Sequence, residues 1–499
     1  MNKPASSSLA NSRESGIVAV ESGLLSGAGD DVICFKGIPY AAPPVGDFRW
    51  RPPQPPPAWS GVRGATEFGA DALQAKTPRT RAPRMDEDCL TLNVWTPASR
   101  GNEKLPVMVW LYGGSFVAGS ASDPRCDGES FARKGVVLVT INYRVGVLGF
   151  LAHPALTAES EHGSSGNYGT LDVLAALAWI KRNIAAFGGD PERVTLFGVS
   201  AGAALISLLL TSPLTKGLLQ QTIQQSPGAF RPLSSLQEAE TEGLKLGADI
   251  DALRRLSAEE IFAKTPLLVP KQRGLTTPRV LRPIRDGWVI RRDERDAYCR
   301  GEILAVPSIV GTNADEGSKL TAAWDITSTD ALDKLIAESF GNSAPQARAL
   351  YAGDGNVRAS VAAMFADTQF NDGARGVVRG LVAKGAPVYR YLLLRQRPGC
   401  GPPNHGDDVP YVFASLAAAA KLDAAPYNDA DERLAETMQD AWVRFAATGD
   451  PNGSGLPRWP ASDAEERYLE LDAPIGVGRG WRKAQLDFLD DYFAQQGPR

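Results

Sequence analysis

The pentapeptide Gly-Val-Ser-Ala-Gly at residues 198–202 constrains the fold of this chain more than any other segment. It follows the apolar run at residues 194–197 and precedes a strongly apolar segment at residues 203–210. This order predicts a buried strand, a sharp turn at Ser200 and a buried helix, the setting that a nucleophile elbow requires. The flanking glycines permit the turn, because a Cβ at either place would collide with the neighbouring strand or helix. The alternative is an ordinary Gly-Ser-Gly turn, since the chain contains 50 glycines.

Continuous apolar runs predict the rest of the core. Three of them, at residues 107–111, 136–141 and 194–197, contain β-branched residues and suit strands buried on both faces of a largely parallel sheet. Between the second and the third, apolar residues at helical spacing over residues 171–184 predict a helix. Helices that alternate with buried strands indicate an α/β fold with helices on both faces of the sheet.

Weaker patterns predict the remaining elements. Further strands are expected around residues 222–225, 308–311 and 389–393. The segments from Ile17 onward and at residues 89–95 are expected to add antiparallel strands to one edge of the sheet. The regions 230–300 and 318–385 are richer in charge and predict a mixture of helices and loops.

The composition, with 43% hydrophobic and 22% charged residues, is that of a soluble globular protein with a large core. No linker divides the chain, so we expect a disordered lead at residues 1–15 and a single domain at residues 16–499. A net charge of −4 does not support nucleic-acid binding, and no run of 18 apolar residues suggests a membrane span. The oligomeric state stays open between a monomer and a weak dimer.

The five cysteines are scattered and form no C-x-x-C pair, which is a poor pattern for disulfides or for zinc. The first dozen residues carry no apolar segment of the kind found in secretion signals. These features predict a cytoplasmic protein, and they leave open an export signal removed before residue 1. The glycine-rich segment at residues 476–480 is not expected to bind a nucleotide, because too little chain follows it for a βαβ unit.

Several segments together resemble the type B carboxylesterases, a family that includes cholinesterases, lipases and bacterial esterases. The resemblance runs from about residue 17 to about residue 470. Residues 187–202 match the family's serine signature, residues 87–97 match its second signature, and shorter matches occur at residues 35–40, 142–144, 166–169 and 448–452. The resemblance implies an α/β-hydrolase fold with a large, mostly parallel central sheet and helical insertions over the active site. It also implies cleavage of small-molecule carboxylic esters through an acyl-serine, with no cofactor or metal.

A serine nucleophile needs a base, and His405 is the only one of three histidines that follows Ser200 in the chain. The expected order is nucleophile, acid, histidine. The acid should follow a strand, and residues 311–318 follow the strand predicted at 308–311. The resemblance assigns this role to Glu316, whereas spacing alone does not separate Glu316 from Asp315. Two other carboxylates, Asp407 and Asp408, are expected to shape the histidine loop.

The resemblance also implies an oxyanion hole made by the backbone N–H groups of Gly114, Ser115 and Ala201. Many relatives have a third glycine where this chain has Ser115, and the donor survives that change unless the residue needs a positive φ. Ser226 is expected to orient the acid as a supporting hydroxyl. Two family ion pairs should serve the scaffold, Arg49 with Glu87 and Arg144 with Asp172.

Two departures from relatives bear on function. Cholinesterases have a tryptophan where this chain has Arg79. The tryptophan binds the choline cation by cation–π attraction, whereas the cationic Arg79 would repel choline and could favour a substrate whose acid part is anionic or polar. Secreted relatives bridge the counterpart of Cys89 to an upstream cysteine, which is missing here. Two rival functions share parts of this pattern. A non-catalytic adhesion protein usually lacks the serine or the histidine, whereas an amidase, carbamate hydrolase or thioesterase would share the same residues.

Overall fold

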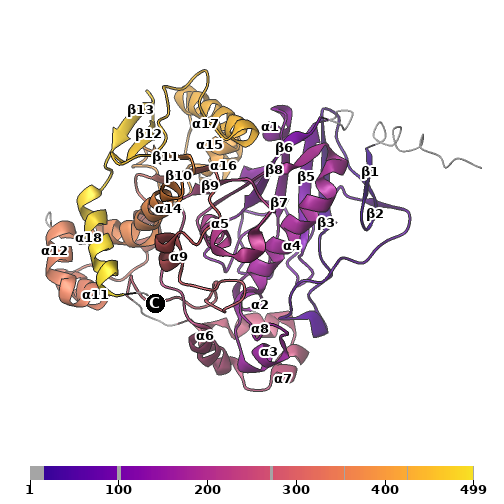
Figure 1. The fold of residues 1–499 in the computed structure, drawn as a ribbon, viewed down its shortest axis with the longest axis horizontal. Coiled ribbons are helices and arrows are strands. Elements are labelled where there is room, and N and C mark those ends of the chain that lie inside the picture. The colour runs from indigo at the N-terminus through magenta and orange to yellow at the C-terminus, as the bar shows by residue number, and fades with distance from the viewer. Residues whose placement is uncertain (1–15, 98–102, 270–273, 353–354, 424, 498–499) are drawn as a thin grey trace, which may run out of the picture.

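A ten-stranded mixed sheet forms the centre of the protein in the structure, a computed structural model (Figure 1). The described residues are 16–97, 103–269, 274–352, 355–423 and 425–497, so the lead expected at 1–15 lies outside them. The strands of the sheet lie in the order β13 (Gly476–Arg479), β12 (Arg467–Leu471), β11 (Val388–Leu393), β10 (Ser308–Asn313), β9 (Gln221–Gln225), β8 (Gly189–Val199), β6 (Leu105–Leu111), β7 (Val137–Ile141), β5 (Thr91–Pro97) and β3 (Val32–Pro39).

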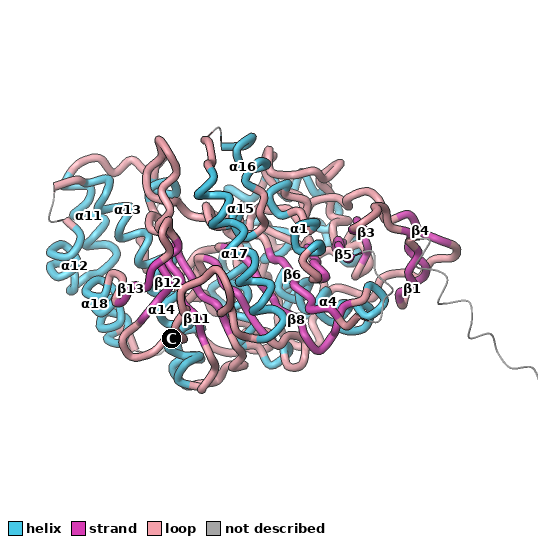
Figure 2. Tube along the Cα trace, turned by 90° about the horizontal axis from the view of Figure 1, so that it is seen from above, coloured by secondary structure: helices cyan, strands magenta, loops and turns pink. Residues whose placement is uncertain are grey.

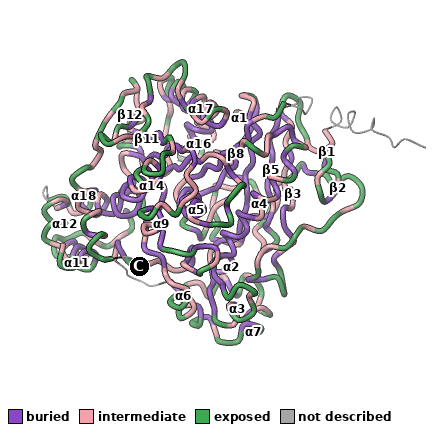
Figure 3. The backbone as a smooth tube through the Cα atoms, viewed as in Figure 1, coloured by how far each residue is buried: buried purple, intermediate pink, exposed green. Residues whose placement is uncertain are grey.

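The seven strands from β12 to β7 in this order are parallel to their neighbours, which confirms the predicted α/β architecture. Antiparallel pairs close the sheet at both ends, with β5 and β3 at one edge and β13 at the other. The three strands predicted from apolar runs and the three predicted from weaker patterns all form, and β6, β7, β9, β10, β11 and the second half of β8 are almost entirely buried (Figure 3).

One expectation for the sheet was wrong, and one strand was not predicted. The segment from Ile17 does not extend the large sheet, because β1 (Ile17–Val20), β2 (Gly23–Ser26) and β4 (Val62–Gly64) form a separate three-stranded sheet. These strands are short and largely solvent-accessible, and the longer β3 occupies the edge beside β5. The strand β13 was not expected, because Gly-Val-Gly-Arg has a low β propensity, yet it pairs with β12.

Helices cover both faces of the sheet (Figure 2). One face packs against α4 (Tyr168–Asn183), α5 (Ala201–Thr211), α9 (Glu294–Arg300) and α14 (Asp372–Ala383), and the other against α1 (Glu129–Arg133), α15 (Val409–Val412) and α17 (Asp429–Thr448). The helix predicted over 171–184 corresponds to α4. The helix α5 is apolar on all sides and buried, as expected for a helix enclosed between other layers.

The regions predicted as mixed helix and loop form the periphery, apart from α9 and α14, which pack on the sheet. The first contributes α6 (Leu236–Gly243), α7 (Ile250–Arg255) and α8 (Ala258–Ala263), near α2 (Gly146–Phe150) and α3 (Pro154–Glu159) in Figure 1. The second contributes α10 (Ser318–Thr321), α11 (Thr329–Phe340), α12 (Ala344–Tyr351) and α13 (Val357–Ala366), while α16 (Leu416–Asp423) lies beyond α15. None of the helices in the described part of the chain combines the length and hydrophobicity needed to cross a bilayer.

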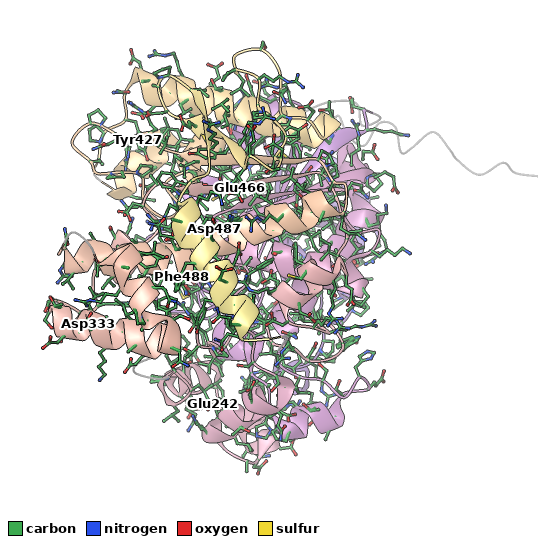
Figure 4. All side chains as sticks on the ribbon, turned by 60° about the vertical axis from the view of Figure 1, so that its left-hand side comes forward. Glu242, Asp333, Tyr427, Glu466, Asp487 and Phe488 are labelled. Atoms are coloured by element: carbon green, nitrogen blue, oxygen red, sulfur yellow. The ribbon has the colours of Figure 1, made fainter. Side chains whose placement is uncertain are left out.

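The last helix, α18 (Lys483–Gln495), docks on this periphery through apolar and ionic contacts (Figure 4). Phe488 contacts Phe340 of α11, with ring centroids 5.4 Å apart. The buried Arg375 of α14 binds Glu466 at 2.7 Å and Asp487 at 2.5 Å. The buried Arg375 beside the apolar contacts of α18 is therefore paired with carboxylates.

The buried Glu294, at the start of α9, gives the fold a predicted pH dependence. It is 2% exposed and accepts a hydrogen bond from Phe230 N at 2.7 Å, and burial raises its pKa from 4.5 to about 7. Between these two values the unfolded chain releases the proton that the folded protein keeps. The free energy of unfolding should therefore fall as pH rises from 4.5 to 7, by on the order of 3 kcal/mol from this group.

The variant Glu294→Gln should lack this part of the pH dependence, because an amide does not ionise. Urea unfolding of both proteins at pH 5 and pH 8 measures the difference. The variant should lose less stability than the wild type between the two values. Equal losses would contradict the account of Glu294.

Candidate active site

The predicted site residues follow five adjacent parallel strands and lie at the C-terminal ends of these strands. The loop after β6 carries residues 113–116, β8 leads into Ser200, and β9 leads into Ser226. Glu316 follows β10, and His405 lies in the connection after β11. Neighbouring parallel strands have their carboxyl ends on the same side of the sheet, and residues distant in sequence therefore come together there.

Ser200 lies at a strained turn between β8 and α5. Its backbone has φ 58° and ψ −118°, a region that non-glycine residues rarely adopt. Ser200 N donates to Gln225 O at 2.9 Å, which ties the turn to β9. A Cβ at Gly198 or Gly202 would lie 2.6 or 2.2 Å from Leu111 O, so the expected clash with the neighbouring strand is confirmed. The turn therefore depends on close backbone contact with β6.

Glu316 and His405 are hydrogen-bonded to each other. His405 Nδ1 and Glu316 Oε2 are 2.5 Å apart, and the Glu316 side chain is fully buried. The other carboxylate oxygen, Oε1, accepts from Ser226 Oγ at 2.5 Å and from Asn313 N at 2.6 Å. Three donors therefore fix the carboxylate, and its orientation holds the imidazole with Nδ1 facing it.

The remaining imidazole nitrogen, Nε2, is buried and makes no hydrogen bond to any described residue. His405 and Ser200 line the same cavity, and the ring of Phe370 packs against the imidazole at a centroid distance of 4.2 Å. Structures without substrate often have long or poorly aligned catalytic hydrogen bonds, which tighten when substrate binds. The arrangement leaves Nε2 available to accept a proton.

The neighbouring carboxylates have different contacts. Asp315 Oδ1 accepts from Gly317 N at 3.2 Å and from Ser318 N at 2.9 Å, so it stabilises the turn before α10. Asp407 Oδ2 accepts from Asn404 N at 2.8 Å within the histidine loop. Asp408 is buried and accepts from Tyr391 at 2.6 Å, and burial raises the pKa of its carboxyl. None of these contacts is made to the imidazole.

The loop after β6 packs directly against the elbow. A Cβ placed on Gly113 would lie 2.8 Å from Ser200 Cβ, and Gly114 has φ 130°. Ala201, the third predicted donor, is the first residue of α5, where a backbone N–H has no partner inside the helix. The positive end of the helix dipole lies at the same place and favours negative charge. Gly114, Ser115 and Ala201 all line the cavity beside Ser200.

Ser115 has a positive φ of 57°, the conformation that makes serine less suitable here than the usual glycine, yet the serine adopts it and its backbone N–H stays in the loop. Its side chain is exposed and its backbone is in the left-handed region. The variant Ser115→Gly should raise the free energy of unfolding by up to about 1 kcal/mol, because glycine adopts this conformation without steric cost. The kcat for an ester should stay within about threefold, because a backbone donor is kept. A tenfold loss in steady-state kcat would instead show that the hydroxyl takes part.

The cavity above Ser200 has a volume of about 480 Å³. The helical insertions contribute Leu320, Trp324, Phe365 and Phe370 to an apolar wall, as expected for material placed over the strand ends. Arg79, which replaces the cholinesterase tryptophan, also lines the cavity. Sequence reasoning missed the aromatic wall, since nothing in the local pattern at residues 320–370 distinguishes cavity residues from core residues. In the described part of the chain, no cluster of three or more His, Cys, Asp or Glu residues could hold a metal ion.

The scaffold around the site contains both predicted ion pairs. Arg49 forms a bidentate pair with Glu87 at 2.5 and 2.7 Å, and Arg144 pairs with Asp172 at 2.7 and 2.8 Å. All four side chains are at least about nine-tenths buried. Removing one partner of such a pair typically costs about 3–5 kcal/mol, because it leaves a buried charge unmatched.

A serine at a strand–turn–helix junction, on a largely parallel sheet with a histidine and a carboxylate at neighbouring strand ends, defines the α/β-hydrolase class. The carboxylesterase family model matches residues 14–489. The chain therefore belongs to the carboxylesterase family and is a serine hydrolase that cleaves carboxylic esters.

Individual relatives agree with this assignment. The chain is 44% identical to a fumonisin B1 esterase of Sphingopyxis macrogoltabida over 471 residues, covering 92% of this chain and 87% of the relative. It is 35% identical to a para-nitrobenzyl esterase of Bacillus subtilis over 481 residues, covering 92% and 96%. The solved structure of a thermophilic PNB esterase superimposes with a TM-score of 0.86 at 32% identity, covering 95% of this chain and all of that one.

Proposed function

We propose that Ser200, His405 and Glu316 are the catalytic triad of this esterase, and that Gly114, Ser115 and Ala201 form its oxyanion hole. His405 Nε2 takes the proton from Ser200 Oγ as the oxygen attacks the ester carbonyl carbon. The three backbone N–H groups stabilise the tetrahedral oxyanion. His405 then gives its proton to the leaving alcohol, and the C–O bond to that alcohol breaks.

Water completes the cycle in the second half. His405 removes a proton from water, which attacks the acyl carbon, and the collapse of the second tetrahedral intermediate returns the proton to Ser200 Oγ. Glu316 stays ionised, accepts the Nδ1–H of His405 and stabilises the imidazolium in each half. Ser226 acts through Glu316 as a positioning residue. The steps need no metal or cofactor.

The observation that carries the proposal is the 2.5 Å contact between His405 Nδ1 and Glu316 Oε2, beside the cavity that Ser200 lines. This contact selects the imidazole tautomer whose Nε2 can act as a base. Small-molecule esters are the proposed substrates. Relatives that include a para-nitrobenzyl esterase and a cocaine esterase support substrates of this size.

Titration with the organophosphate paraoxon tests the nucleophile. One equivalent of 4-nitrophenolate should be released per chain, and no further activity should remain. Ser115→Gly, which removes another cavity hydroxyl, should still release one equivalent, whereas Ser200→Ala should release none. Release of a full equivalent by Ser200→Ala would overturn the assignment.

We also propose that residues 16–499 form one domain, which acts in the cytoplasm as a monomer or weak dimer. The support for one domain is the sheet, whose strands come from residues 32–479. The support for a reducing compartment is that all five cysteines are free, and that burial raises the thiol pKa of Cys89 and Cys126. Sedimentation velocity over a range of concentrations tests the oligomeric state, and a tight dimer or a larger assembly would contradict it.

A further inference from the structure

The cavity above Ser200 carries an excess of positive charge. Its lining includes two carboxylates, Asp123 and Asp407, and six cationic side chains, Arg79, Arg125, Arg231, Arg279, Arg282 and Lys319. One pair is matched internally, since Arg125 binds Asp123 at 2.7 Å and both side chains are mostly buried. A cavity for neutral esters gains nothing from so many cations, because each one must be partly removed from water.

Two of these arginines donate hydrogen bonds to the same residue, Gln369. Arg231 donates to the Gln369 carbonyl oxygen at 2.7 and 3.1 Å, and Arg279 donates to Gln369 Oε1 at 2.7 Å. Both acceptors are uncharged oxygens of Gln369, and these bonds orient the two guanidinium groups. Gln369 is itself buried, and its amide nitrogen donates to Leu275 O at 2.8 Å. The two cations are therefore preorganised rather than loosely placed.

Gln369 lies in a π-helical turn, η8 (Asp367–Asn371), between α13 and α14. Such turns are rare and often occur at functional sites, because the extra residue shifts side chains from their helical positions. The turn places Phe370 beside the imidazole of His405 while Gln369 contacts the arginines. One short segment thus links the cationic side of the cavity to the proposed triad.

The distance from the cations to the reacting atoms is short. The Phe370 ring centroid lies 4.2 Å from that of His405 and 4.9 Å from the Arg231 guanidinium carbon. Arg231 is therefore within about 9 Å of the imidazole ring. Another cation, the buried Arg282, lies over the ring of Phe116 in the oxyanion loop, at 5.2 Å. Positive charge flanks both the base and the proposed oxyanion hole.

We infer that the cavity selects half-esters of dicarboxylic acids, in which a free carboxylate remains on the acid part. This inference rests on the proposed role of Ser200. A carboxylate three or four bonds from the scissile carbonyl lies about 4–6 Å away from it, inside the cavity that Ser200, Arg231 and Arg279 all line. Guanidinium groups held in a fixed orientation bind a carboxylate through paired charge-assisted hydrogen bonds. The guanidinium group of Arg79 disfavours choline esters, because it has the same charge as the choline group.

Ethyl hydrogen succinate and ethyl succinamate test the inference, because they match in shape and differ in one negative charge. The wild type should hydrolyse the half-ester with a kcat/KM at least about tenfold higher. Arg231→Gln and Arg279→Gln should each lower kcat/KM for ethyl hydrogen succinate by about 10- to 100-fold. The kcat/KM for ethyl succinamate should stay within about threefold of the wild-type value. Arg300→Gln, an exposed arginine on α9, is the matched control and should change neither value.

Two further readouts separate selectivity from folding. Free succinate should inhibit turnover of the neutral 4-nitrophenyl acetate competitively in the wild type, and much less in Arg231→Gln. Arg231→Lys should recover part of the preference for the half-ester. Equal wild-type kcat/KM for the two ethyl esters would overturn the inference, and so would an equal loss on both substrates in Arg231→Gln and Arg279→Gln.

Failure of this inference is distinguishable from failure of the triad. If 4-nitrophenyl acetate is hydrolysed in a Ser200-dependent manner while the half-ester is not preferred, only the selectivity is wrong. If Ser200→Ala hydrolyses 4-nitrophenyl acetate as the wild type does, the triad assignment itself is wrong.

Discussion

Replacing Ser200 by alanine should lower kcat for 4-nitrophenyl acetate by on the order of 10⁶, which leaves only background hydrolysis. The substitution removes a single oxygen, which is the atom proposed to form the acyl-enzyme. Alanine keeps the Cβ, so the backbone at φ 58° and ψ −118° carries the same strain in both proteins. The free energy of unfolding should therefore change by less than about 0.5 kcal/mol.

Both quantities are needed for this test. Steady-state kinetics measures the loss of kcat, and urea unfolding shows that the fold is intact. Ser115→Gly serves as the control for a hydroxyl that lines the same cavity. A Ser200→Ala protein that folds normally and keeps more than about one hundredth of the wild-type kcat would contradict the role of Ser200.

The second large effect concerns Glu316. In Glu316→Gln, the donors Ser226 Oγ and Asn313 N should hold the amide oxygen where Oε1 now lies. The amide NH₂ would then face His405 Nδ1, which must become an acceptor. The proton moves to Nε2, so the imidazole can no longer accept a proton from Ser200. We expect kcat to fall by on the order of 10³–10⁴.

Asp315→Asn is the matched control, one residue away. Its amide oxygen can still accept from Gly317 N and Ser318 N, so the turn is kept. The expected loss in kcat is below about tenfold and comes from the stability of the turn. Both variants are compared by kcat under the same conditions. If Asp315→Asn were the crippled variant, the triad would be displaced by one residue.

The strands that carry the site could be predicted from sequence because their signals are local. Continuous apolar runs mark β6, β7 and β8, since strands buried on both faces need apolar side chains at every position. The elbow at Ser200 was predictable for a similar reason, because its glycines are required by contact with Leu111. Choosing Glu316 over Asp315, however, rested on resemblance to a family and not on spacing.

Features that depend on distant packing could not be predicted in this way. β1, β2 and β4 form a small separate sheet while β3 pairs with β5 at the edge of the large one, and no local pattern tells which segment takes that edge. The cationic side of the cavity is similar, since its arginines come from separate segments of the chain. Arg79 stands out by its difference from the cholinesterase tryptophan, whereas Arg231 and Arg279 both donate to Gln369, which is distant from each of them in sequence.

The central claim is that ester hydrolysis passes through an acyl group on Ser200. It is tested most directly by acid-quenching the wild type during turnover of 4-nitrophenyl acetate and mapping the acetylated tryptic peptide by mass spectrometry. One acetyl group should appear on the peptide of residues 194–216, and fragmentation should place it on Ser200. Glu316→Gln should accumulate this species far more slowly. An acetyl group on Ser115 or Ser226, or at none of these serines during turnover, would contradict the account.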